Sequence, residues 1–172
     1  MAEKIVTLFG TAGARPGDAA YTLAYETGKI LAQAGFVIAN GGYGGTMLAA
    51  AKGARQAGGK TIGVTCESFK ASSANEYITR EIVTASLDER LDTLIKLGQA
   101  YVVLPGGTGT LLELAMVWEL KNKDFLKKSK PIILVGEFWK PLVDLIESDE
   151  QGSISHIQIV AGPKEIVDIL TA

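Results

Sequence analysis

The sequence predicts an α/β protein, a doubly wound fold with a mostly parallel sheet covered by helices on both faces. Short apolar runs alternate with helical patterns along the whole chain, which is typical of repeated strand–helix units. The runs are apolar throughout instead of alternating with polar residues, as in strands buried on both faces. With 172 residues, 47% of them hydrophobic, the chain suits a single domain, which we expect to span residues 1–172.

Seven apolar runs are the predicted strands, and helical patterns separate most of them. The strands are expected at residues 5–9, 36–39, 61–65, 81–84, 101–104, 132–135 and 157–160. The helices are expected at residues 19–34, 46–57, 86–97, 110–122, 140–146 and 164–170. Asp18 is placed to cap the first helix and Gly35 to end it, while Ser86 and Glu89 form a capping pattern at the third.

The composition excludes several classes of function. The net charge is −2, so no global positive field exists to hold nucleic acid or an anionic membrane, and a small-molecule partner is expected. One Cys and one His are too few for a zinc site within one chain, so no metal is expected. Cys66 cannot form an internal disulfide, which indicates a reducing, cytoplasmic location. No nucleophile elbow accompanies His156, which is expected to be structural.

Two segments have some features of targeting or membrane signals, and neither fits. The apolar run 5–10 is too short for the core of a signal peptide. Residues 30–51 carry no charge but include five glycines, which is unusual in a helix that spans a membrane. We therefore expect a soluble protein.

Two glycine clusters, residues 40–45 and 105–109, each follow a predicted strand and open a helix. Ligands bind at this edge of α/β sheets, since helix N-termini present free N–H groups and glycine lets the backbone approach a phosphate. Neither cluster is a P-loop or a Gly-x-Gly-x-x-Gly dinucleotide motif. A tight connection without a ligand is the alternative interpretation of each cluster.

Two charged residues accompany these clusters, and each has two interpretations. Glu113 follows the second cluster by one helical turn, so it either flanks a ligand or completes a capping box with Thr110. Arg90 lies in the first turn of its helix, where a cation opposes the helix dipole. It is either a ligand-binding residue or a surface salt-bridge partner of Asp88 and Glu89.

Residues 105–113 read Pro-Gly-Gly-Thr-Gly-Thr-Leu-Leu-Glu and match the Pro-Gly-Gly-x-Gly-Thr-x-x-Glu signature of the LOG family. These are cytokinin-activating nucleoside 5′-monophosphate phosphoribohydrolases, long mislabelled as lysine decarboxylases. Arg90 stands at the family's spacing before Pro105, and residues 10–13 and 40–47 resemble its other glycine turns. The sequence also resembles the molybdenum cofactor carrier proteins, which are similar to the same family.

This resemblance implies a Rossmann-like, nucleotide-binding domain that hydrolyses the N-glycosidic bond of a nucleoside 5′-monophosphate to free base and ribose 5-phosphate. Arg90 would orient the substrate, and Glu113 would stabilise an oxocarbenium-like transition state or position the attacking water. The implied phosphate and ribose ligands are Gly10, Thr11, Gly42, Gly44, Gly45, Thr46, Gly106, Gly107, Thr108, Gly109 and Thr110. No metal or organic cofactor is implied, and the partner is a nucleoside monophosphate or a related phosphate ligand.

Three departures from the family pattern concern substrate recognition. Leu91 stands where a lysine usually follows the arginine, Asn40 and Thr46 replace a glycine and a leucine, and residues 66–77 lack a proline-rich loop. A non-catalytic nucleotide or molybdenum-cofactor carrier is accordingly the alternative function.

Two further expectations concern the surface. The predicted helix 110–122 is apolar nearly all round over residues 111–118, which indicates burial on more than one side. Together with the resemblance, since related enzymes dimerise through neighbouring helices, this predicts a homodimer. The lysine-rich run 121–130 is expected to be a solvated helix end.

Overall fold

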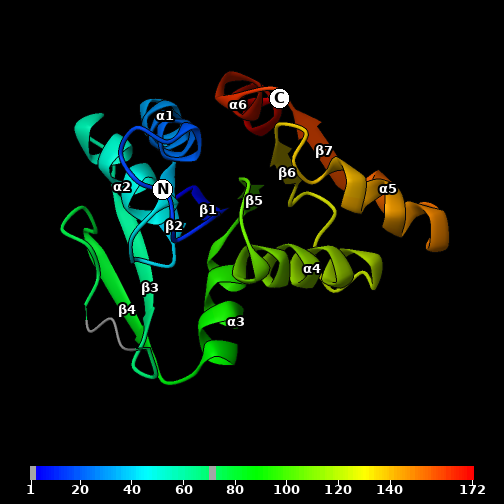
Figure 1. The fold of residues 1–172 in the computed structure, drawn as a ribbon, viewed down its shortest axis with the longest axis horizontal. Helices are drawn as coiled ribbons and strands as arrows, with labels where there is room; N and C mark the ends of the chain where they lie inside the picture. The colour runs from blue at the N-terminus through cyan, green and yellow to red at the C-terminus, as the bar shows by residue number, and fades with distance from the viewer. Residues whose placement is uncertain (1–2, 70–72) are drawn as a thin grey trace.

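The computed structural model describes residues 3–69 and 73–172, and its centre is a seven-stranded sheet (Figure 1). Along the sheet the strand order is β4-β3-β2-β1-β5-β6-β7, and each neighbouring pair is parallel. The strands are β1 (Ile5–Phe9), β2 (Val37–Asn40), β3 (Thr61–Cys66), β4 (Arg80–Thr84), β5 (Ala100–Val103), β6 (Ile132–Val135) and β7 (Ile157–Val160). The predicted fold class is confirmed, and the described sheet is parallel throughout.

Helices cover both faces of the sheet and enclose two separate cores (Figure 1). One face carries α1 (Ala19–Gln33), α2 (Thr46–Gln56) and α6 (Pro163–Thr171), and the other carries α3 (Leu87–Leu97), α4 (Thr108–Asn122) and α5 (Lys140–Asp149). The backbones of α1 and α2 lie in contact at Gly28 and Gly53, where a Cβ atom would overlap a carbonyl of the other helix. No helix among residues 3–69 and 73–172 is both long and apolar enough to cross a membrane.

The strand order reverses at β1. The chain adds β2, β3 and β4 on one side of β1, and α3 then returns it to β5 on the other side. Because the connections leave β1 and β5 in opposite directions, a crevice opens outside the carboxyl ends of these two strands. Two of the predicted ligand segments, residues 10–13 after β1 and the 105–109 cluster after β5, lie at this point.

Helix α5 ends at Asp149, three residues later than predicted, and the start of α4 and the capping of α1 also differ from the predictions. Helix α4 begins at Thr108, two residues earlier than predicted, because extended Gly107 is its N-cap and accepts a hydrogen bond from the amide of Leu111. Asp18 is the N-cap residue of α1, but its carboxylate accepts a hydrogen bond from the amide of Arg15 instead of capping the helix.

The lysine-rich run 121–130 is only partly the solvated helix end that was predicted. Lys121 is buried and donates a hydrogen bond to the carbonyl of Lys128, and Lys130 donates one to the carbonyl of Gly98. Burial lowers the pKa of both ammonium groups, and Lys127 lowers that of Lys130 further. The prediction was wrong for these two residues because loop carbonyls without backbone donors accept their hydrogen bonds.

Candidate active site

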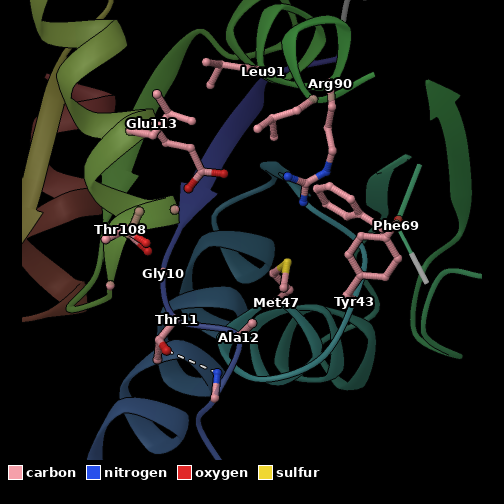
Figure 2. Close-up of a pocket in the computed structure, with 16 residues that line it drawn as sticks. Gly10, Thr11, Ala12, Tyr43, Met47, Phe69, Arg90, Leu91, Thr108 and Glu113 are labelled. Atoms are coloured by element: carbon pink, nitrogen blue, oxygen red, sulfur yellow. Dashed lines mark hydrogen bonds between the residues drawn. The ribbon is translucent and has the colours of Figure 1, made fainter. Parts of the chain in front are cut away.

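A cavity of about 610 Å³ lies in the crevice between β1 and β5 (Figure 2). Five segments line it: residues 10–13 after β1, Tyr43 and Met47 around the start of α2, Phe69 after β3, Leu87, Arg90 and Leu91 in α3, and residues 107–110, Leu112 and Glu113 at α4. Among residues 3–69 and 73–172, Arg90 and Glu113 are the charged residues that line it, and the other described lining groups are backbone, hydroxyl and apolar groups.

The N-terminus of α4 supplies backbone donors to this cavity. The amides of Thr108, Gly109 and Thr110 precede the first intrahelical hydrogen bond, which runs from Leu111 to Gly107. Free amides and the positive end of the helix dipole favour an anion such as a phosphate. Gly106 does not line the cavity, and a side chain there would overlap that of Thr110.

The turn after β1 forms the facing wall. The hydroxyl of Thr11 accepts a hydrogen bond of 3.1 Å from the amide of Gly13 (Figure 2). The carbonyl of Thr11 accepts two hydrogen bonds from Thr46, one from its amide and one from its hydroxyl, both 2.9 Å long. Thr46 is buried and therefore holds this wall from behind.

The glycines of the first cluster support the site instead of lining it. Buried Asn40 accepts a hydrogen bond from the amide of Gly42 and donates one to the carbonyl of Met47, so it fixes the loop to the start of α2. Gly45 has a φ of +63° and lies so close to Ala12 that a side chain would overlap its backbone. The cavity lining includes none of the predicted ligands Gly42, Gly44, Gly45 and Thr46.

Arg90 is a buried cation held by neutral groups. Its side chain is 8% exposed, its Nε donates to the carbonyl of Val64 (2.7 Å), and its Nη2 donates to the carbonyl of Gly41 (3.2 Å). The rings of Tyr43 and Phe69 lie 5.6 and 5.4 Å from its Cζ. No carboxylate among residues 3–69 and 73–172 forms an ion pair with it. The surface salt-bridge interpretation is therefore wrong, although Ser86 and Glu89 do cap α3 as predicted.

Glu113 points into the cavity toward Arg90 from the opposite side (Figure 2). It lies beyond the first turn of α4, whose N-cap is Gly107, so the capping-box interpretation is wrong. Burial raises the pKa of its carboxyl to about 7, and the nearby Arg90 guanidinium partly opposes this rise. Within the described part of the chain its carboxylate forms no ion pair, so its oxygens are available to a ligand.

The aromatic and apolar walls were not predicted. Tyr43 lies within the first glycine cluster, where the glycines alone were predicted to bind a ligand. No sequence motif near Phe69 indicates that it lies in a binding site. Both line the cavity with Met47 and Leu91, and Leu91 provides an apolar surface where LOG proteins usually have a lysine. His156 lies outside the cavity, in the short 3₁₀ helix Ser153–His156.

The sequence matches a known protein family over nearly its whole length. A family model described as the SLOG cluster4 family matches residues 3–167. The chain belongs to this family. Among curated relatives, the cytokinin riboside 5′-monophosphate phosphoribohydrolase of Rhodococcoides fascians is 32% identical over 149 residues, 84% of this chain and 74% of that protein. The enzyme of the same name from Mycobacterium tuberculosis is 35% identical over 66% of this chain and 60% of that protein.

Two similar solved structures carry a different description. The molybdenum cofactor binding protein from Rippkaea orientalis superposes with a TM-score of 0.81 and 25% identity, over 99% of this chain and 97% of that chain. The Moco carrier protein of Chlamydomonas reinhardtii gives a TM-score of 0.74 and 26% identity, over 100% of both chains. The predicted resemblances to the LOG family and to the carrier proteins are both confirmed, since the chain is similar to curated phosphoribohydrolases of that family and to solved carrier structures.

Proposed function

We propose that this SLOG cluster4 protein hydrolyses the N-glycosidic bond of a nucleoside 5′-monophosphate, giving a free base and ribose 5-phosphate. The observation that carries the proposal is the opposition of Glu113 and Arg90 across a cavity that has a free helix N-terminus at one end. Such a cavity offers an anion site for a phosphate, a carboxylate for a developing positive charge, and a fixed cation in one space.

In the proposed reaction the phosphate binds the amides at the start of α4, opposite the turn after β1. The Glu113 carboxylate faces the ribose, binds its hydroxyls and stabilises positive charge at C1′ as the bond to the base nitrogen lengthens. The oxygen of a water molecule bonds to C1′, the bonding pair leaves with the base, and the proton lost by the water neutralises the base. Arg90 orients the substrate through the N–H groups that the two carbonyls leave free.

Base release tests this directly. The purified protein is incubated with AMP, the other common nucleoside monophosphates and isopentenyl-AMP, and the free base and ribose 5-phosphate are quantified by chromatography. We expect the two products in equal amounts, and no cleavage of the nucleosides that lack the phosphate. Nucleotide binding without any base release would contradict the proposal.

The rate of base release is expected to rise with pH through neutrality. A carboxylate can stabilise positive charge only when it is ionised, and the pKa of Glu113 is about 7. At pH 6 the rate should therefore be roughly one tenth of its alkaline plateau. A series of kcat/KM measurements between about pH 5.5 and 8.5, which report ionisation of the free protein, checks this, and a rate that falls over this range would show that protonated Glu113 is the active form.

A second candidate function is a carrier that binds a phosphate-bearing ligand without turnover. The two structural neighbours described as molybdenum-cofactor proteins support it, as does Leu91 in place of the usual lysine. The same helix N-terminus would hold the phosphate of the pterin cargo. Tight binding of the molybdenum cofactor in calorimetry, with no base released from any nucleotide, would favour this function.

The protein is further proposed to be a homodimer that associates through α4. Leu111, Leu112 and Met116 on this helix are 36%, 43% and 40% exposed in the single chain, and burying them against a second copy is favourable. Light scattering should give twice the mass of the chain, and Met116→Glu should give the monomer. A wild-type protein that elutes as a monomer at micromolar concentration would contradict the proposal.

A further inference from the structure

Asn75, which lies between β3 and β4, is hydrogen-bonded to the first glycine cluster. The Asn75 amide nitrogen donates hydrogen bonds to the carbonyls of Gly42 (3.1 Å) and Tyr43 (2.8 Å), and the backbone amide of Asn75 donates to Gly42 as well (2.8 Å). Its side-chain oxygen accepts a hydrogen bond from the amide of Tyr77 (3.0 Å). Two donors and one acceptor are thus used at once, a combination that the side chains of Asp and Ser cannot supply at this length.

The loop that Asn75 holds carries two of the groups that fix Arg90. The carbonyl of Gly41 accepts from Arg90, and the ring of Tyr43 lies beside the guanidinium. The hydroxyl of Tyr43 anchors the same loop to β3, since it accepts from the amide of Cys66 (2.8 Å) and donates to its carbonyl (3.2 Å). Arg90 has no carboxylate partner among the described residues, so these neutral contacts determine where its charge lies.

We propose that Asn75 is a positioning residue, which acts through the loop 41–43 to hold the guanidinium of Arg90 opposite Glu113. The inference rests on the proposed function, because its first test measures kcat for base release. Losing the side chain removes the side-chain donor to the Tyr43 carbonyl and one of the two donors to the Gly42 carbonyl, whose bond from the Asn75 backbone amide remains. The loop is then held less firmly at Tyr43 and moves together with the Gly41 carbonyl. Arg90 then moves away from the position in which it faces the ribose and Glu113.

The test compares Asn75→Ala with Thr79→Val. The control lies on the same segment, and it also removes side-chain hydrogen bonds, those with Thr61 at the other end of β3. We expect Asn75→Ala to lower kcat about tenfold with a smaller change in KM, as misplacing a catalytic group does. Thr79→Val should retain wild-type kcat.

A second readout does not require turnover. Carbon-13 NMR of labelled glutamate carboxyls, with Glu113 assigned from Glu113→Gln, follows the titration of Glu113 in each variant. Of the groups lining the cavity, Arg90 is the cation that lowers the pKa of this carboxyl, so Asn75→Ala should raise that pKa and Thr79→Val should leave it unchanged. If Asn75→Ala does not fold, Tyr43→Phe keeps the ring, removes the bonds with Cys66 and should change kcat and pKa in the same directions.

The outcomes separate the two proposals. If the wild-type protein releases no base, the proposed function fails, while the titration of Glu113 still decides the role of Asn75. If base is released and Asn75→Ala matches Thr79→Val in both kcat and the Glu113 titration, the positioning role is overturned. A loss of kcat with an unchanged Glu113 titration would also overturn it, because Arg90 would then not have moved.

Discussion

Replacing Glu113 by Gln is expected to lower kcat for base release by about 10³-fold, while nucleotide affinity changes by only a few fold. The substitution keeps the size and the hydrogen-bonding oxygen of the side chain but removes the charge that stabilises C1′ in the transition state. The phosphate contacts at the start of α4 are unaffected, so the ground-state complex should still form. Single-turnover base release and calorimetric titration with AMP measure the two quantities separately.

The matched control is Glu119→Gln on the same helix, where the carboxylate is exposed and pairs with Lys123. It should retain full kcat. A Glu113→Gln variant that keeps wild-type kcat would reject the catalytic role of this carboxylate and leave it as a ligand contact.

The same substitution should stabilise the fold at alkaline pH. The pKa of Glu113 lies above its usual value because burial disfavours the charge, so the native state binds more protons than the unfolded state between about pH 4.5 and 7. The free energy of unfolding therefore falls over this range as pH rises, and the cost is complete above pH 7. Glu113→Gln removes this cost, so its Tm relative to wild type should be higher at pH 8 than at pH 5, which calorimetry at both pH values would show.

The fold could be predicted because its signals are local. Each strand is a short run buried on both faces, so its apolar character is visible without knowledge of its neighbours. The run at 132–135, for example, is β6 with the predicted bounds. The position of the site followed from the same pattern, since strand ends of a parallel sheet lie at one edge and the 105–109 cluster follows β5.

The parts that were missed depend on contacts between distant residues. Arg90 is held by Val64 and Gly41, which lie on or after other strands, and nothing near position 90 in the chain indicates them. Gly45 and Thr46 were predicted as ligands from the resemblance to the LOG family, and a glycine before a helix fits both a phosphate loop and a support. The packing of Gly45 against Ala12 and the burial of Thr46 behind the Thr11 carbonyl indicate a support, and both are contacts between distant residues.

Replacing Arg90 is expected to have an effect close to that of Glu113→Gln. Arg90→Met keeps most of the length of the side chain but removes the charge and the donors, and kcat should fall by about 10²–10³-fold. Arg90→Lys keeps the charge but cannot donate to the carbonyls of Val64 and Gly41 in the fork geometry of a guanidinium, so it should also lose most of the activity. The pH profile separates the two variants, because only Arg90→Met removes the cation that lowers the pKa of Glu113. Its acid limb should move to higher pH, and that of Arg90→Lys should stay near the wild-type position.

A variant at a different position tests whether the location of the guanidinium matters in addition to its charge. A side chain at Gly41 would overlap Nη2 of Arg90 and come within 2.6 Å of the sulfur of Met47, so Gly41→Ala must displace Arg90 while leaving it intact. We expect kcat to fall by about 10²-fold. Gly162→Ala is the matched control, since a Cβ atom there meets no other atom within 4 Å. Full activity in Gly41→Ala would mean that Arg90 can act from more than one position, and the arrangement of carbonyls and rings around it would then serve the stability of the fold.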